Sequence, residues 1–151
     1  MEGVFSRNFQ VGWRDVDPNG HVANMAYLGY AVDTRVGYFA SRGFPPTEFN
    51  KQAVGPVIKS DFAEYFREVL MLENIRVTNE NGGHSEDGSR FRVVNNIYKA
   101  DGVLACRIVS IGGWLSLRTR KLIEPPDVLK SAWLELPRTE DFEDLRSSLK
   151  R

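Results

Sequence analysis

One segment of the chain has the hydrophobic periodicity of an α-helix, and the segments before and after it have the alternation typical of β-strands. This single helix limits the possible folds of the chain more than any other feature. From about Asn24 to Arg42, apolar and aromatic residues recur at offsets of three and four. One stripe contains Met25, Leu28, Val32, Val36, Phe39 and Ala40, and an almost opposite stripe contains Tyr27, Tyr30, Thr34 and Tyr38. A helix with such residues on two sides is expected to be enclosed by the rest of the protein.

Strand patterns precede and follow this helix. Residues 5–13 alternate between two faces, with Phe5, Phe9 and Trp13 on the more apolar one. Further strands are expected near residues 57–66, 71–77, 91–97 and 103–117, with a long polar hairpin loop at 81–88 and a tight turn at 101–102. The order predicts an α+β fold, in which an antiparallel sheet of about five strands wraps one central helix.

The length of 151 residues suits a single domain. We therefore expect one domain over residues 1–151, with its core at about residues 5–125. Pro126 and Asp127 have the pattern of a helix start, so residues 126–151 are predicted to form a helical tail.

The charge balance and composition exclude several classes of protein. Twenty Lys and Arg residues face twenty Asp and Glu residues, so the chain has no net charge to attract nucleic acid or an anionic membrane surface. No apolar run approaches the roughly 18 residues of a membrane span, and the N-terminus lacks a secretory signal pattern. One cysteine, Cys106, and two histidines supply neither a disulfide nor a Cys/His zinc site. These features predict a cytoplasmic protein without a metal, a nucleic-acid partner or a membrane partner.

The residues that suggest chemistry lie almost entirely in residues 14–27, R-D-V-D-P-N-G-H-V-A-N-M-A-Y. Asp15 and Asp17 lie in a loop directly before the long helix. A helix N-terminus has unpaired backbone N–H groups and a partial positive charge, and it can stabilise a developing oxyanion. A carboxylate just upstream can act as a nucleophile or as a base for water. One short segment therefore offers both parts of an acyl-transfer site.

A purely structural interpretation of the same residues remains open. Asp, Pro, Asn and Gly form turns, and an acid before a helix is an ordinary partner for the helix dipole. His21 is then structural or exposed, Asn24 is a helix N-cap, and the tyrosines belong to the core.

The span Val11 to Phe39 resembles the acyl-CoA thioesterases of the hotdog fold, in the 4-hydroxybenzoyl-CoA thioesterase-like branch. The family pattern combines D-x-D, a turn with glycine, a G-H-V-N-N segment and Y-L at the start of the helix. Matching positions are Asp15, Asp17, Gly20, His21, Val22, Asn24, Tyr27 and Leu28. The acid of F-R-E, Glu68, and the later G-G-W-L also look like the family, so the resemblance covers about residues 5–125.

This resemblance implies a hotdog fold and hydrolysis of an acyl-CoA substrate without a cofactor. Asp17 matches the catalytic carboxylate, which acts as nucleophile or general base. Asn24 matches the position at the helix N-terminus whose backbone N–H polarises the thioester carbonyl. His21 and Tyr27 also match motif positions, whose role in the family is more often architectural, and they are candidate substrate-binding residues. The resemblance also implies a homodimer or homotetramer, because the family's active site lies against a second subunit.

The sequence departs from the family pattern at three positions. Ala23 replaces the first Asn of the usual pair, and Ser116 stands where many relatives have Asp. Val32 stands where related enzymes often have an acid that recognises the substrate hydroxyl. An apolar or aliphatic acyl group is therefore expected to fit better than a hydroxybenzoyl group.

A CoA substrate also requires cations for its phosphates. Arg118, Arg120 and Lys121 follow the last long strand and are candidates for this role, although a solvated strand end has the same composition. The sequence thus predicts an acyl-CoA thioesterase. The alternatives are a hotdog hydratase or dehydratase that uses Asp17 and His21, a non-catalytic protein that binds acyl or aromatic ligands, and a purely structural dimer.

Overall fold

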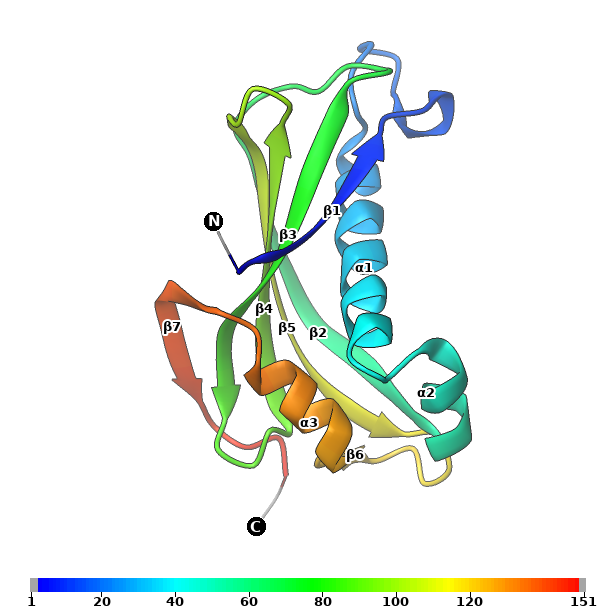
Figure 1. Cartoon of the computed structure of the whole chain (residues 1–151), viewed down its shortest axis with the longest axis vertical. Helices are drawn as coiled ribbons and strands as arrows, with labels where there is room; N and C mark the ends of the chain where they lie inside the picture. Colours follow the sequence, from blue (N-terminus) through cyan, green and yellow to red (C-terminus); the bar gives the residue numbers. More distant parts are fainter. Residues whose placement is uncertain (1–2, 150–151) are drawn as a thin grey trace.

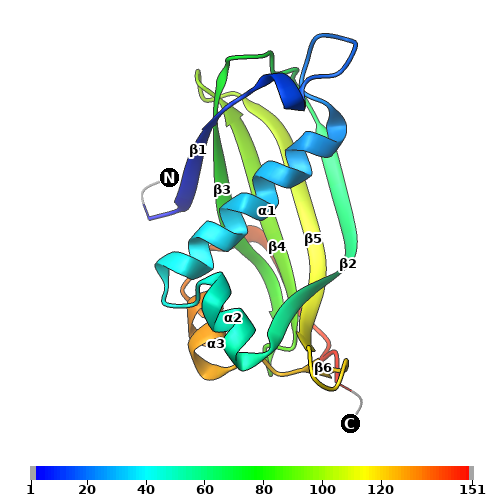
Figure 2. The ribbon, with the colours of Figure 1, turned by 90° about the vertical axis from the view of Figure 1, so that its right-hand side faces the viewer.

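The computed structural model describes residues 3–149, and it has one long helix lying along one face of a sheet (Figures 1 and 2). The main elements are β1 (Phe5–Gln10), α1 (Asn24–Ser41), β2 (Val54–Tyr65), β3 (Asn74–Ser85), β4 (Arg90–Lys99) and β5 (Leu104–Ser116). These strands have the order β1-β3-β4-β5-β2 and are all antiparallel. The predicted α+β arrangement with a helix against an antiparallel sheet is confirmed.

Smaller elements complete the chain. They are a 3₁₀ turn (Trp13–Asp15), α2 (Pro46–Gln52), β6 (Leu122–Ile123), α3 (Asp127–Leu134) and β7 (Arg138–Leu145). β6 pairs with the end of β5, and β7 pairs with β3. With these additions the sheet has seven strands rather than about five.

The two stripes of α1 have different environments, and this differs from the expectation of an enclosed helix. The tyrosine stripe is buried against the sheet, since Tyr27, Tyr30 and Tyr38 are less than a tenth exposed. The other stripe is partly open, because Met25 is 79% exposed, Val32 42% and Val36 44%, although Phe39 at its C-terminal end is buried. The described chain covers only one side of the helix.

Two apolar clusters lie between α1 and the sheet, and a band of polar side chains separates them. Ala31, Val77 and Ile97 belong to the cluster under the N-terminal half of α1. Tyr38 and Trp114 belong to the cluster under its C-terminal half. The band consists of Thr34, Arg35, Asn79, Asn95 and Ser110, of which all but Arg35 are fully buried.

Two local predictions are wrong. β1 ends at Gln10, and Trp13 lies beyond it in the 3₁₀ turn with 80% of its side chain exposed. The long polar loop predicted at residues 81–88 does not form, because β3 continues to Ser85 through Gly82 and Gly83. A Cβ on Gly83 would lie 2.5 Å from the carbonyl oxygen of Glu143, so this glycine permits the close approach of β7.

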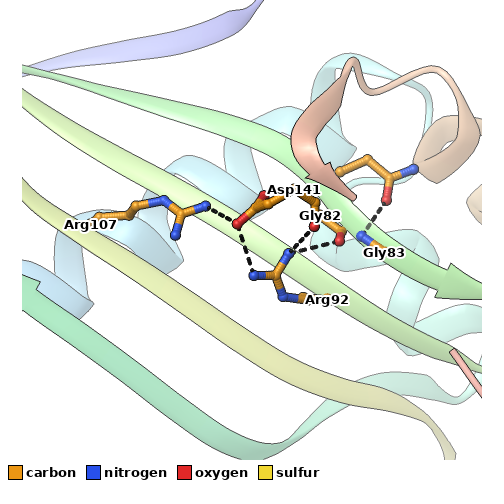
Figure 3. A network of polar contacts seen from close by, with 6 residues as sticks. Gly82, Gly83, Arg92, Arg107 and Asp141 are labelled. Carbon is orange, nitrogen blue, oxygen red and sulfur yellow. Dashed lines mark hydrogen bonds and ion pairs between the residues drawn. The ribbon is translucent and has the colours of Figure 1, made fainter. Parts of the chain in front are cut away.

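The C-terminal segment, predicted as a helical tail, contains a helix and a strand. α3 is followed by β7, which pairs in parallel with the second half of β3, while β1 occupies the first half of the same edge (Figure 1). On the face opposite α1, Asp141 of β7 lies 3.2 Å from Arg92 and 2.8 Å from Arg107 (Figure 3). Hydrogen bonds from Arg92 and Arg107 hold the pKa of Asp141 well below its usual range. The charge of Asp141 therefore links β7 to β4 through Arg92 and to β5 through Arg107.

Within the described part of the chain, no helix is long and apolar enough to cross a membrane.

Candidate active site

The loop between β1 and α1 is a short hairpin that fixes the position of Asp17. The backbone N–H of Asp17 donates to the carbonyl of His21 at 2.9 Å, and that of Gly20 donates to the carbonyl of Asp17 at 3.0 Å. Gly20 has φ +81°, a left-handed conformation that favours glycine. The N–H of Val22 donates to the carbonyl of Val69 at 2.8 Å, which ties the hairpin to the segment after β2. The D-P-N-G sequence thus forms a turn and also presents an acid.

The carboxylate of Asp17 is oriented by its own loop. Oδ1 accepts a hydrogen bond from the backbone N–H of Asn19 at 2.9 Å. Oδ2 lies 3.6 Å from Nδ1 of His21, which is also 3.1 Å from the carbonyl oxygen of Val22. The Asp17 side chain is 23% exposed, so the carboxylate is accessible to a ligand.

Asp15 has a different environment from Asp17. Its Oδ2 accepts a hydrogen bond from the hydroxyl of Tyr30, and its carbonyl accepts from the N–H of Ala23 at 2.8 Å. Burial and the bond to Asp15 raise the pKa of Tyr30 above its usual value. Asp15 thus fastens the loop to α1, whereas Asp17, the second acid of D-x-D, lines the cavity described below.

α1 begins at Asn24, as predicted, and its N-terminus is open. The N-cap residue is Ala23, without a side-chain cap, so the alternative in which Asn24 is the N-cap is wrong. Among the described residues, no acceptor contacts the backbone N–H of Asn24. This N–H and the partial positive charge of the helix end are therefore available to an oxygen of a ligand.

A cavity of about 390 Å³ brings these groups together. Its lining includes four of the predicted site residues, namely Asp17, His21, Asn24 and Tyr27. Tyr27 is only 4% exposed, and burial raises its pKa to about 12, so its hydroxyl is neutral near pH 7.

The opposite wall of the cavity was not predicted as a unit. It consists of Tyr65, Phe66, Arg67 and Glu68, at the end of β2 and just beyond it. The ring of Tyr65 packs on Tyr27 with centroids 5.4 Å apart, and its hydroxyl donates to the carbonyl of Asn24 at 3.4 Å. Only Glu68 had a signal in the sequence, as the acid of F-R-E. Arg67, directly before it, places an exposed cation beside the cavity.

The structure does not bring the other predicted cations to this cavity. Arg118, Arg120 and Lys121 form the turn between β5 and β6, where the N–H of Leu117 donates to the carbonyl of Ala53. This turn lies beside the start of β2 (Figure 2). The Asp17 cavity is lined by Tyr65 at the other end of β2. β2 has 12 residues, so within one chain the two places are about 35 Å apart.

A second cavity, of about 380 Å³, lies beside the C-terminal half of α1. Val32 and Val36 line it from α1, and Trp114 lines it from the sheet. Asp33 is exposed and lines neither this cavity nor the first. The half-open stripe of α1 is thus the wall of an apolar cavity.

Residues 3–149 contain no group of three or more His, Cys, Asp and Glu side chains arranged to hold a metal ion.

The sequence pattern of the thioesterase-like superfamily matches residues 11–133, which include both the D-x-D loop and the sheet. The chain belongs to this superfamily. Membership supports the hydrolysis of a thioester as the general class of activity. A comparison with curated protein sequences finds no match.

Solved structures support the same fold. The hypothetical protein SAV2348 from Staphylococcus aureus, in complex with CoA, is 19% identical with a TM-score of 0.79 over 89% of this chain and 86% of its own. Slr0204, a 1,4-dihydroxy-2-naphthoyl-CoA thioesterase from Synechocystis, is 16% identical with a TM-score of 0.77 over 87% and 96%. A putative oleoyl thioesterase from Lactobacillus plantarum is 16% identical with a TM-score of 0.81, covering 98% of this chain but 54% of its own. The predicted hotdog fold is confirmed.

Proposed function

We propose that this protein is an acyl-CoA thioesterase, which converts an acyl-CoA and water to a free acid and CoA. One observation carries the proposal, namely that the Asp17 carboxylate and the N-terminus of α1 line the same cavity in a member of the thioesterase-like superfamily. Thioester hydrolysis needs a group that attacks or activates water and a group that stabilises the oxyanion. Asp17 and the backbone N–H of Asn24 supply these two functions.

The reaction proceeds by one of two routes through the same residues. In the first, a carboxylate oxygen of Asp17 attacks the carbonyl carbon, the C–S bond breaks, and water hydrolyses the resulting anhydride. In the second, Asp17 accepts a proton from water while the water oxygen attacks the carbonyl carbon. In both, the carbonyl oxygen becomes negative and the N–H of Asn24 donates to it. His21 positions Asp17 from 3.6 Å, and Tyr27 forms the floor beneath the thioester.

A homodimer formed through β2 is part of the proposal. β2 is the last strand of the sheet on its side, and β5 is its one partner strand in the described chain. Its apolar residues Val57, Ile58 and Phe62 are between 37% and 63% exposed. An open apolar edge promotes strand pairing, and pairing across a two-fold axis removes the edge from both subunits. Two such dimers could associate further as a homotetramer.

This dimer gives the predicted cations a place in the site. If two β2 strands pair antiparallel, the start of one lies beside the end of the other. The partner subunit's Arg118, Arg120 and Lys121 then approach the end of β2, near Asp17. Together with Arg67 they would bind the phosphates of CoA. The turn that is remote in one chain becomes part of a site shared by two.

The oligomeric state tests this arrangement directly. Light scattering at micromolar concentration is expected to give the mass of a dimer or a tetramer. Phe62→Glu, which places a charge on the β2 edge, is expected to shift the protein toward monomers and lower hydrolysis with them. Val103→Glu introduces the same charge at an apolar residue that is 42% exposed and lies outside β2, and it is the control. A monomer that hydrolyses acyl-CoA at the full rate would refute the shared site.

The proposed activity is tested with a panel of acyl-CoA substrates that includes short, medium, long and aromatic acyl groups. Release of CoA is followed as free thiol. Turnover of at least one substrate by the wild-type protein, lost in Asp17→Asn, is the expected result. A folded protein that binds the panel without releasing thiol would be a non-catalytic ligand-binding protein.

A second activity is favoured by one contact. The 3.6 Å separation of Asp17 and His21 also suits a hydratase, which adds water across a carbon–carbon double bond with an acid and a histidine. Loss of absorbance from an enoyl-CoA, without thiol release, would favour that activity over hydrolysis.

A further inference from the structure

The cavity beside the C-terminal half of α1 has apolar walls and a polar floor. Val36 and Phe39 of α1, Phe49 of α2 and Trp114 of β5 contribute to its walls. Two polar side chains reach it from below, Arg35 from α1 and Asn79 from β3. Both belong to the polar band that separates the two apolar clusters.

Arg35 is held rigidly across the sheet. Its Nε donates to Oδ1 of Asn95 at 2.8 Å, and its Nη2 donates to Oγ of Ser110 at 2.7 Å. Ser110 in turn donates to Oδ1 of the exposed Asp61 at 2.5 Å. Among residues 3–149, Nη1 of Arg35 has no hydrogen-bond acceptor. Burial lowers the pKa of Arg35 to about 10, so the guanidinium remains cationic near neutral pH.

Asn79 has an unpaired donor at the same place. Its side chain is fully buried, and its Oδ1 accepts a hydrogen bond from Nδ2 of Asn95 at 2.9 Å. This contact fixes the orientation of the amide, and Nδ2 is left without a partner. A buried polar atom without a partner is destabilising, and a ligand that accepts its hydrogen bond removes that penalty.

We propose that this cavity binds a molecule with an apolar body and a carboxylate, with the carboxylate on Arg35 and Asn79. Both groups on the floor are donors, one of them is a cation, and a carboxylate is the acceptor that matches both. A ligand hydroxyl matches less well, because its own proton finds no acceptor there. The apolar walls then cover the carbon chain or ring.

The volume sets the size of the ligand. At about 30 Å³ per water molecule, 380 Å³ is equivalent to roughly a dozen non-hydrogen atoms. Octanoate fits this limit. Octanamide has the same shape and size without the charge, so the pair isolates the contribution of the carboxylate.

Trp114 and Trp133 line the cavity, so their fluorescence reports binding directly. Octanoate is expected to bind at least about tenfold more tightly than octanamide, because hydrogen bonds to a charged group are the stronger kind. Equal affinities for the two compounds, or no binding of either, would overturn the proposal. Calorimetry with the same two compounds provides an independent measurement.

Substitutions of Asn79 and Arg35 test whether the carboxylate of the ligand binds to these two side chains. Asn79→Asp keeps the acceptor that bonds to Asn95 and replaces the free donor with an anion, and it is expected to weaken octanoate binding by about tenfold or more. Arg35→Met is expected to have a similar effect, whereas Arg35→Lys keeps the cation and is expected to retain the preference for octanoate over octanamide. Asn79→Asp and Arg35→Met are expected to weaken octanamide binding less than octanoate binding, because a neutral carbonyl accepts weaker hydrogen bonds than a carboxylate does.

Asn8→Asp is the control for Asn79→Asp, because it makes the same chemical change at an exposed position on β1. Circular dichroism verifies that each variant is folded. Unchanged octanoate affinity in folded Asn79→Asp and Arg35→Met would disprove the assignment. These affinity measurements do not depend on thioester hydrolysis; only the comparison of two acyl-CoA substrates below rests on the proposed function.

Two sources can present this chemistry. One is a free acid, and the other is an acyl group that ends in a second carboxylate. A preference for suberoyl-CoA over octanoyl-CoA in hydrolysis, lost in Asn79→Asp, would assign the cavity to the acyl group. Binding of octanoate without that preference would assign it to a free acid. Either result supports a carboxylate site.

Discussion

The two halves of α1 lie beside two cavities of nearly equal volume and opposite character. The cavity at the N-terminus is lined mainly by the loops before α1 and after β2, and it contains an oriented carboxylate and an open helix end. The cavity at the C-terminal half has apolar walls and rests on a buried polar band. One helix thus borders a polar cavity with an acid at its N-terminus and an apolar cavity along its C-terminal half, which we propose to be the reactive site and a ligand-binding site. The helix rises 1.5 Å per residue, so Asn24 and Val36 are about 18 Å apart.

The largest effect is expected from the carboxylate at the N-terminal end. Asp17→Asn removes the proposed base or nucleophile and keeps the size of the side chain, and it is expected to lower kcat by about 10²–10⁴-fold. Asp15→Asn is expected to lower kcat less, because Asp15 contacts Tyr30 rather than the cavity. Steady-state thiol release measures both. Nearly full turnover by folded Asp17→Asn would show that the reactive end of α1 is misassigned.

The two ends are also expected to differ in their contribution to stability. Trp114 is 2% exposed and packs against Phe39 and Phe91, so Trp114→Ala is expected to lower the free energy of unfolding by about 3–5 kcal/mol. Trp13, near the N-terminal end of α1, is 80% exposed. Trp13→Ala is therefore expected to change the free energy of unfolding by about 0.5 kcal/mol or less. Urea denaturation measures both. A large loss in Trp13→Ala would mean that a partner subunit covers this residue.

The proposed role of the Asn24 backbone N–H can be tested by a substitution that removes this N–H. Asn24 is the first residue of α1, where proline is accepted, and Ala23 has the extended conformation (φ −66°, ψ 144°) that a following proline requires. Asn24→Pro removes the N–H and is expected to lower kcat by about 10²–10³-fold, as for other oxyanion donors.

Asn24→Ala keeps the backbone N–H and separates its effect from that of the side chain. It is expected to retain most of the activity that Asn24→Pro loses. If both variants lose activity equally, the side chain carries the role, for example by holding the attacking water.

The smallest expected effects concern acyl length and connect the two cavities. If the acyl group occupies an apolar cavity, each methylene should add about 0.8 kcal/mol to transition-state binding until the cavity is full. We expect kcat/KM to rise from acetyl-CoA to medium-chain acyl-CoA, without a preference for 4-hydroxybenzoyl over benzoyl. A preference for 4-hydroxybenzoyl-CoA that is lost in Asp33→Asn would contradict this expectation.

Val36→Phe narrows the cavity beside the C-terminal half of α1 and is expected to shift the optimum toward shorter chains. Met25→Phe enlarges a residue on the same stripe that does not line that cavity, and it serves as the control. An unchanged optimum in Val36→Phe would place the acyl group elsewhere.

Local patterns in the sequence determined the positions of the long helix and of several strands, and they grouped four candidate site residues. The period of residues 24–42 predicted α1 to within one residue, and alternation with turn signals predicted β4 and β5 closely. The D-x-D turn and the helix start placed Asp17, His21, Asn24 and Tyr27 at one site because all four lie within eleven residues of one another. Such patterns are sufficient where the contacts that matter are near in sequence.

Only the tertiary structure decided the rest. The parallel pairing of β7 with β3 has no local signal, because it rests on the approach of Glu143 to Gly83 and on the contacts of Asp141. Arg118, Arg120 and Lys121 were predicted as candidates for binding the CoA phosphates, but within one chain the length of β2 separates them from Asp17. The polar band at the second cavity links Arg35 of α1 to Asn95 and Ser110, and Asn95 to Asn79, so that it joins α1 to three strands. No period in the sequence encodes these contacts, because the order of the strands and their register determine which distant residues face one another.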